Sequence, residues 1–105
     1  MMSRRYLFSA IISAMLAVSA HAETTQITME KLAFAPAVVN ATVGDRIEWI
    51  NNDILVHTAT ARNGDWDITI APNKTVVLTL KKAGTIEYYC RYHPNMKGRV
   101  LIAPK

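Results

Sequence analysis

The stretch VVNATVGDRIEWI, residues 38–50, contains two short runs of strand-forming residues joined by a turn. Val38 to Thr42 is rich in β-branched residues, and Arg46 to Ile50 reads polar, apolar, polar, apolar, apolar. Such alternation is typical of a strand with one buried face. Val43-Gly44-Asp45, between the two runs, has the composition of a tight turn. The stretch therefore predicts a strand, a turn and a second strand.

The same alternation of strand and turn signals continues on both sides of this stretch. Further runs rich in Val, Ile, Thr and Tyr predict strands at residues 26–29, 57–61, 74–80, 85–89 and 98–102. No window of the sequence shows convincing helical periodicity. Several short strands at this spacing in so small a chain predict an all-β fold, a small β-sandwich.

The first 22 residues have the layout of an export signal. Arg4 and Arg5 form a basic region, residues 6–18 are mainly apolar, and Ala20-His21-Ala22 is a small-x-small cleavage motif. A membrane-anchoring helix is the alternative, but the apolar stretch is shorter than the ~20 residues a span needs. We therefore predict a signal peptide at 1–22 and a single exported, periplasmic domain at 23–105. The paired arginines leave the export route open.

The composition of the domain limits its partners and the means of stabilising it. The whole chain has a formal net charge of +4, to which the signal arginines contribute two. So mild a charge, without a run of Lys or Arg, does not predict a nucleic-acid partner. Cys90 is the only cysteine, so no disulfide can form within the chain. A bound metal is the other common way to stabilise so small an exported domain.

Soft metal-donor atoms gather in CRYHPNM, residues 90–96. Cys90 is expected to end the strand 85–89, and the next strand to begin near Lys97 or Gly98. The donors then share a tight loop, which Pro94 stiffens.

The remaining donor has to come from another part of the sandwich. His57 opens the strand 57–61, and it is the only other histidine once the signal peptide is removed. His57, Cys90, His93 and Met96 supply two imidazoles, a thiolate and a thioether, the donor set of blue copper centres. Zinc would fit less well, because it usually recruits Cys, His or carboxylate.

These motifs resemble those of the cupredoxins, the family of type-1 blue copper proteins. CRYHPNM is similar to the short Cys-x-x-His-x-x-Met ligand loop of the amicyanins. FAPAVVNATVGDRIEWINNDILVHTAT, residues 34–60, resembles the family's strand, Val-Gly-Asp turn, Trp-x-Asn and first copper histidine. KKAGTIEYYC, residues 81–90, resembles the strand that leads into the copper cysteine.

The resemblance implies a Greek-key β-sandwich with one copper, bound equatorially by His57, Cys90 and His93 and axially by Met96. It also implies a protein that shuttles single electrons between redox partners and is not an enzyme. By family analogy, the donor would be a quinoprotein amine dehydrogenase and the acceptor a c-type cytochrome. We expect a monomer with no nucleic-acid partner and no stable membrane insertion after signal cleavage.

The chain departs from the family pattern directly after the first histidine. Many cupredoxins have an asparagine there, whose side chain helps to connect the two ligand loops, but this chain has Thr58. The backbone amide of Thr58 can still donate to the sulfur of Cys90. The sequence leaves open whether the threonine side chain replaces the missing connection.

Other interpretations of the same residues remain at this point. Cys90 could be a small buried hydrophobe uncoupled from any metal, or a nucleophile, which would need an orienting third group. A periplasmic copper carrier is the main alternative function, although the chain has few spare Met or His residues. A copper enzyme would need an open coordination position. An apolar docking patch around His93 would be lined by Met29, Pro36, Leu55, Pro72 and Pro94.

Overall fold

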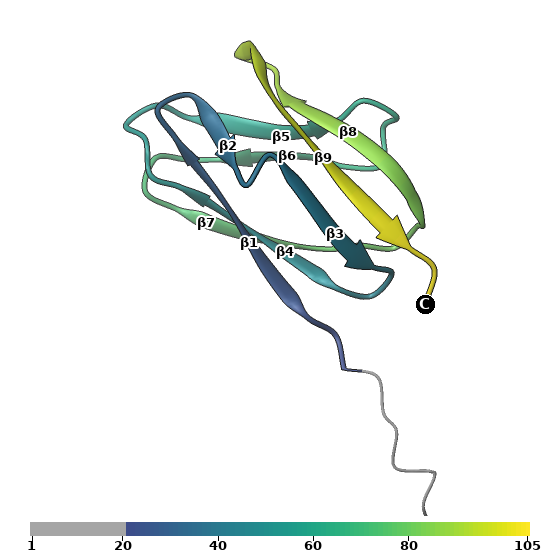
Figure 1. Ribbon diagram of the computed structural model, residues 1–105. Helices are drawn as coiled ribbons and strands as arrows, with labels where there is room; N and C mark the ends of the chain where they lie inside the picture. Colours follow the sequence, from purple (N-terminus) through teal and green to yellow (C-terminus); the bar gives the residue numbers. More distant parts are fainter. Residues whose placement is uncertain (1–20) are drawn as a thin grey trace, which may run out of the picture.

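A computed structural model of the protein describes residues 21–105, which form two packed β-sheets (Figure 1). Most of the predicted signal peptide lies outside these residues. The described part of the chain has nine strands: β1 Thr24–Glu30, β2 Ala33–Ala35, β3 Val38–Thr42, β4 Arg46–Asn51, β5 His57–Ala61, β6 Asp67–Ile70, β7 Thr75–Thr79, β8 Gly84–Cys90 and β9 His93–Ala103. Within residues 21–105, no helix is long and apolar enough to cross a membrane.

The two sheets have four and five strands. The first has the order β2-β1-β4-β7 and the second β3-β9-β8-β5-β6. Strands β1 and β4 pair in parallel, as do β3 and β9, whereas the other pairs are antiparallel. Several neighbours are not consecutive in sequence, as in a Greek-key arrangement. The predicted all-β sandwich is therefore confirmed.

Two strands of the structure, β2 and β6, were not predicted from the sequence. Strand β2 has only three residues, two of them alanine, and it pairs with β1 after a two-residue turn at Lys31 and Leu32. Both turn residues have positive φ, 55° and 58°, without being glycine. Strand β6 has four residues and begins with Asp67. Such short segments carry too few side chains for a periodic pattern to stand out.

The core between the sheets is built on three aromatic rings. Phe34, Trp49 and Tyr88 pack edge to face. The ring centroid of Tyr88 lies 4.8 Å from that of Phe34 and 5.0 Å from that of Trp49, and the centroids of Phe34 and Trp49 are 6.1 Å apart. Opposite Tyr88, on β9, lies Gly98. A Cβ at Gly98 would lie 2.6 Å from Cζ of Tyr88 and 2.9 Å from the carbonyl oxygen of Ala37. The glycine is required because the tyrosine fills the space of a side chain.

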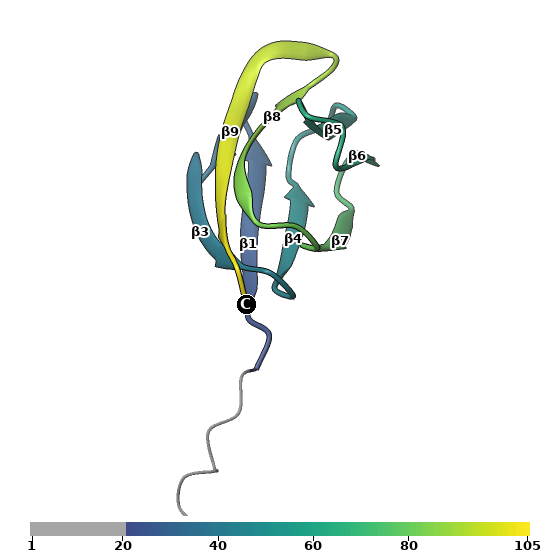
Figure 2. The ribbon, with the colours of Figure 1, turned by 90° about the vertical axis from the view of Figure 1, so that its right-hand side faces the viewer.

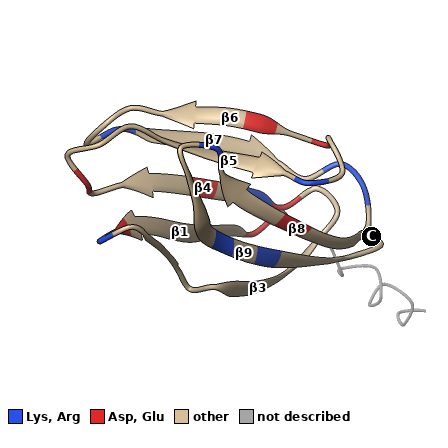
Figure 3. Ribbon diagram, turned by 90° about the horizontal axis from the view of Figure 1, so that it is seen from above, with Lys and Arg blue, Asp and Glu red and all other residues tan. Residues whose placement is uncertain are grey.

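The start of β1 and the predicted metal ligands lie at opposite ends of the sandwich. The start of β1 and the C-terminus lie at one end, and the β8–β9 turn lies at the other (Figures 1 and 2). Basic and acidic residues are scattered over the described part of the chain, with two basic segments on β9 and acidic ones on β1, β4, β6 and β8 (Figure 3). The end with the β8–β9 turn is the end where the predicted metal ligands meet.

Candidate metal centre

Three of the four predicted ligands converge at one point of the structure. His57 begins β5, Cys90 ends β8 and His93 begins β9. The sulfur of Cys90 lies 3.7 Å from Nδ1 of His57 and 3.7 Å from Nδ1 of His93. The three donor atoms all lie within 4.8 Å of one another. Met96 is also near and is 2% exposed, so residues from three strands supply all four predicted donors.

The ligand segment differs in shape from the loop that the sequence predicted. Strand β9 begins at His93, not near Lys97 or Gly98, and only a two-residue turn separates it from β8. Cys90 pairs with His93, whereas the preceding residue, Tyr89, pairs with Lys97. Residues 94–96 therefore have no partner on β8 and form a bulge, which breaks the alternation of the strand. The bulge lets Met96 point inward, close to the other ligands.

Thr58 connects the two ligand segments, which answers the question that the sequence left open. Its backbone N–H donates to the sulfur of Cys90 at 3.3 Å. Its hydroxyl oxygen accepts a hydrogen bond from the backbone N–H of Arg91 at 2.8 Å. The threonine side chain thus makes the connection for which many cupredoxins use asparagine.

The hydroxyl of Thr58 belongs to a short hydrogen-bond network on the outer face of the five-stranded sheet. It lies 3.0 Å from the hydroxyl of Thr60, which donates to Asp67 at 2.8 Å. Nε of Arg91 lies 3.3 Å from the same carboxylate. The hydrogen bond from Thr60 and the guanidinium of Arg91 hold the pKa of Asp67 below its usual value. The turn after Cys90 is therefore held through both its backbone and the side chain of Arg91.

His57 is oriented by Asp53, a residue that the sequence analysis did not single out. Nε2 of His57 lies 2.7 Å from Oδ2 of Asp53, and the imidazole is fully buried. Burial alone would raise the pKa of the Asp53 carboxyl. Hydrogen bonds from His57 and from the backbone N–H groups of Lys31 and Leu32 lower it, and the net shift is downward. The carboxylate is thus ionised and accepts a hydrogen bond from the Nε2–H group of His57.

This contact settles which nitrogen of His57 is available to a metal. With Nε2 donating to a carboxylate, the neutral imidazole carries its lone pair on Nδ1. Nδ1 is also the atom that faces the sulfur of Cys90. A carboxylate behind a ligating histidine fixes the ring and raises its basicity, as in many metal sites. The sequence did contain a signal, an acidic residue four positions before the histidine, but that spacing is too common to be informative.

Asn51, the last residue of the Trp-x-Asn motif, holds the segment that leads into His57. Its fully buried side chain donates to the carbonyls of Leu55 and Ile70 at 2.8 and 2.9 Å. Its side-chain oxygen accepts the backbone N–H of Asp53 at 2.8 Å. The connection between β4 and β5 is therefore fixed by side-chain hydrogen bonds where the sandwich provides no strand pairing.

The donor set fits copper better than the other metals that proteins commonly bind. Cysteine sulfur and thioether are soft donors, imidazole nitrogen suits copper among other metals, and a thioether ligand is characteristic of copper centres. A catalytic Cys-His pair would need a third group aimed at the reacting histidine and an anion-stabilising site. Asp53 could serve as that third group behind His57, but Cys90 and His57 are both fully buried, so the thiol has no access to a substrate. The arrangement is that of a closed metal site.

Comparison with known families agrees with the fold and the donor set. The model of the Cupredoxin-like domain matches residues 5–102, and the chain therefore belongs to the cupredoxin family. Amicyanin-alpha of Methylorubrum extorquens is 28% identical over 89 residues, which span 79% of this chain and 75% of that protein. Amicyanin of Paracoccus versutus is 22% identical over 87 residues, which span 77% and 66% of the two chains.

Solved structures show the same architecture. The reduced state of an amicyanin variant has a TM-score of 0.65 and 25% identity, and the match spans 82% of this chain and 86% of that one. A purple cupredoxin from Nitrosopumilus maritimus has a TM-score of 0.66 at 20% identity, over 75% of this chain and 99% of the other. This second likeness shows the fold alone.

The predicted docking patch is only partly at the surface. Met29 is fully buried in the core, so its inclusion in the patch was wrong. Leu55 is 45% exposed, and its neighbours Ile54 and Val56 are also exposed. Pro94 is exposed beside the half-buried His93. Pro36 is exposed and Pro72 is half-buried. In the chain, the exposed residues 54–56 adjoin His57, and Pro94 adjoins His93.

Proposed function

We propose that this protein is a type-1 blue copper protein of the amicyanin kind that carries single electrons in the periplasm. The observation that carries the proposal is the convergence of three buried or half-buried donors within 4.8 Å of one another. His57, Cys90 and His93 would hold the copper as equatorial ligands, and Met96 would be the weak axial ligand. Copper, when bound, would supply a one-electron couple between Cu(II) and Cu(I).

The protein's own contribution is to keep the donors in one arrangement. Asp53 orients His57, and the backbone N–H of Thr58 donates to the sulfur of Cys90. Both His57 and Cys90 are fully buried, so the surrounding sandwich excludes water from that side. Because the donors lie on three packed strands and hydrogen bonds from Asp53 and Thr58 hold two of them, little rearrangement should accompany a change of charge. A rigid, dry site of this kind suits electron transfer.

We propose that electrons enter and leave through the edge of His93. This residue is the only one of the four ligands that is more than slightly exposed. Its ring centroid lies 5.2 Å from that of His57, and the exposed residues 54–56 lead directly into His57. These apolar residues and Pro94 suit transient docking of another redox protein. A quinoprotein amine dehydrogenase as donor and a c-type cytochrome as acceptor are the partner classes that the amicyanin relatives favour.

Copper loading followed by voltammetry tests the proposal. The mature domain should bind one Cu(II), turn blue and give a reversible one-electron wave, and a blue protein should oxidise or reduce a c-type cytochrome. A variant with Leu55 and Ile54 changed to Ser should keep its colour and potential but exchange electrons more slowly. A copper carrier would bind the metal without a reversible wave. A colourless complex, or one that cannot cycle, would contradict the proposal.

A further inference from the structure

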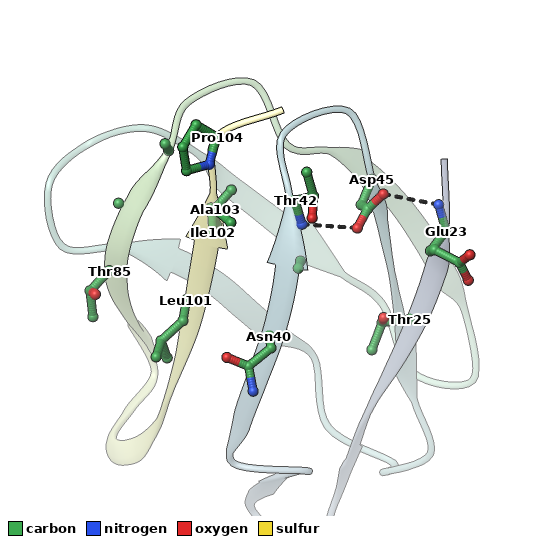
Figure 4. Close-up of a pocket in the computed structure, with 13 residues that line it drawn as sticks. Glu23, Thr25, Asn40, Thr42, Asp45, Thr85, Leu101, Ile102, Ala103 and Pro104 are labelled. Carbon is green, nitrogen blue, oxygen red and sulfur yellow. Dashed lines mark hydrogen bonds between the residues drawn. The ribbon is translucent and has the colours of Figure 1, made fainter. Parts of the chain in front are cut away.

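The end of the sandwich farthest from the metal centre carries a carboxylate held by two backbone amides. Oδ1 of Asp45 accepts a hydrogen bond from the backbone N–H of Glu23 at 2.9 Å, and Oδ2 accepts one from Thr42 at 2.9 Å (Figure 4). Asp45 is 9% exposed. The hydrogen bonds, first that from Glu23, lower the pKa of the Asp45 carboxyl. The carboxylate is therefore negatively charged at neutral pH.

The predicted cleavage site coincides with this contact. The small-x-small motif at residues 20–22 predicts a cut between Ala22 and Glu23. The nitrogen of that peptide bond is the atom that donates to Asp45. The carbonyl of Glu23 is also engaged, because it accepts the backbone N–H of Arg46 at 2.9 Å. Glu23 is thus held by the domain on both sides, one residue before β1 begins.

We propose that removal of residues 1–22 stabilises the folded domain by creating an ion pair between the new N-terminus and Asp45. A signal peptidase would hydrolyse the bond between Ala22 and Glu23 with one water molecule. The carboxylate would leave with residues 1–22, and the nitrogen of Glu23 would become a free amine that takes up a proton at neutral pH. An uncharged amide donor would then be replaced by an α-ammonium. The inference rests on the predicted cleavage site and is independent of the copper assignment.

Electrostatics favour the charged form of this amine. An α-amino group ordinarily titrates near about 7.7–8.0, and a carboxylate in contact with it raises that pKa. The other charged groups near it are the side chain of Glu23, Arg46 on β4, and Lys105 near the end of the chain. Arg46 and Lys105 oppose the protonation, whereas Glu23 supports it. The direct contact with Asp45 outweighs them, since charge-assisted hydrogen bonds are stronger than those of neutral groups.

The position of the pair gives it a structural role. Glu23 precedes β1 in the four-stranded sheet, whereas Thr42 ends β3 in the five-stranded sheet. Asp45 lies between them and links the two sheets at one end of an open groove of about 850 Å³ (Figure 4). In the uncut chain the same amide would donate without a charge. The mature domain should therefore be more stable than the precursor.

Two chains that differ by one N-terminal residue test this inference. One begins at Glu23 and the other at Ala22, so both keep the N–H of Glu23 but only the first carries the charge on that nitrogen. The midpoint of thermal unfolding near pH 6.5 should be higher for the Glu23 chain by about 1–8 °C, the range for a partly exposed ion pair in so small a domain. The raised pKa makes this stability complete below about pH 7.7. It should be lost as pH rises through the folded pKa.

Asp45→Asn provides the control, because it keeps the shape of the side chain and removes its charge. In that variant the two chains should unfold at the same temperature. If Asp45→Asn does not fold, the pH dependence of the two wild-type chains decides the question. The intact mass of the protein exported with its native leader should correspond to a chain starting at Glu23. A different start, or equal stability of the two chains at every pH, would overturn the inference.

Discussion

The hydroxyl oxygen of Thr58 accepts the backbone N–H of Arg91 at 2.8 Å, across 33 positions of the sequence. The same threonine donates its own backbone N–H to the sulfur of Cys90 at 3.3 Å. One residue therefore fixes both the end of β8 and the turn that follows it, relative to the start of β5. The hydroxyl takes the part that an asparagine side chain has in many cupredoxins.

Removing this hydroxyl should loosen the ligand turn. Thr58→Val keeps the shape and the backbone donor but leaves the N–H of Arg91 without its partner, at a cost of about 1–2 kcal/mol. Urea unfolding should show that loss, and copper should be released faster to a chelator. Thr58→Ser retains the hydroxyl and is the matched control. Equal behaviour of the Val and Ser variants would mean that the hydrogen bond does not support the turn.

Changing Asp53 should alter the redox behaviour of the site without removing a ligand. Asp53→Asn replaces an anionic acceptor for the Nε2–H of His57 by a neutral one. A less basic imidazole stabilises Cu(II) less well, so the reduction potential should rise while the protein stays blue. Glu48→Gln, on β4 of the other sheet, removes a carboxylate that contacts Gln26 and not His57, and it should leave the potential unchanged. An equal shift in both variants would point to overall charge as the cause.

Replacing Met96 should change the reduction potential of the site without abolishing copper binding. Met96→Leu fills the same buried space with an apolar side chain of similar volume. Loss of a weak thioether donor to Cu(II) should shift the potential upward while the blue colour persists. Voltammetry of the two proteins under the same conditions measures the shift. An unchanged potential, or failure to bind copper, would show that Met96 is not an axial ligand.

Cys90 is the only possible source of a thiolate-to-copper charge-transfer band, because the chain has one cysteine. Cys90→Ser should therefore be colourless with Cu(II) while keeping the far-ultraviolet circular dichroism of a β-sandwich. The N–H of Thr58 can donate to the serine oxygen, so the fold has no reason to change. A blue Cys90→Ser protein would exclude the proposed ligand set.

Acid should weaken the end of the sandwich that Asp45 holds. Its hydrogen bonds from Glu23 and Thr42 depress the pKa of the folded carboxyl below the ordinary value of 3.8. The stabilisation is therefore present above about pH 3.8 and is lost as pH falls through the lower, folded pKa. Metal-free protein should show a shallower acid dependence of unfolding as Asp45→Asn than as wild type. Identical slopes would mean that Asp45 does not contribute.

Features that depend on residues close together in the chain could be predicted from the sequence. The Val-Gly-Asp turn and the alternation in residues 46–50 were sufficient to place β3 and β4. Cys90, His93 and Met96 lie within seven residues, so any compact turn brings them together. His57 followed because few other donors were available, and the family resemblance placed it first in the ligand set. Local propensity and composition carry this kind of information.

Features that join distant parts of the chain could be seen only in the folded protein. The contact of Asp53 with the β1–β2 turn depends on the pairing of β1 with β4 in the four-stranded sheet, whereas that of Thr58 with Arg91 depends on the pairing of β5 with β8 in the five-stranded sheet. The start of β9 at His93, and the bulge that turns Met96 inward, depend on strand register, which the pairing of β8 with β9 sets. Such pairings are decided by packing across the whole sandwich, and no short stretch of sequence contains them.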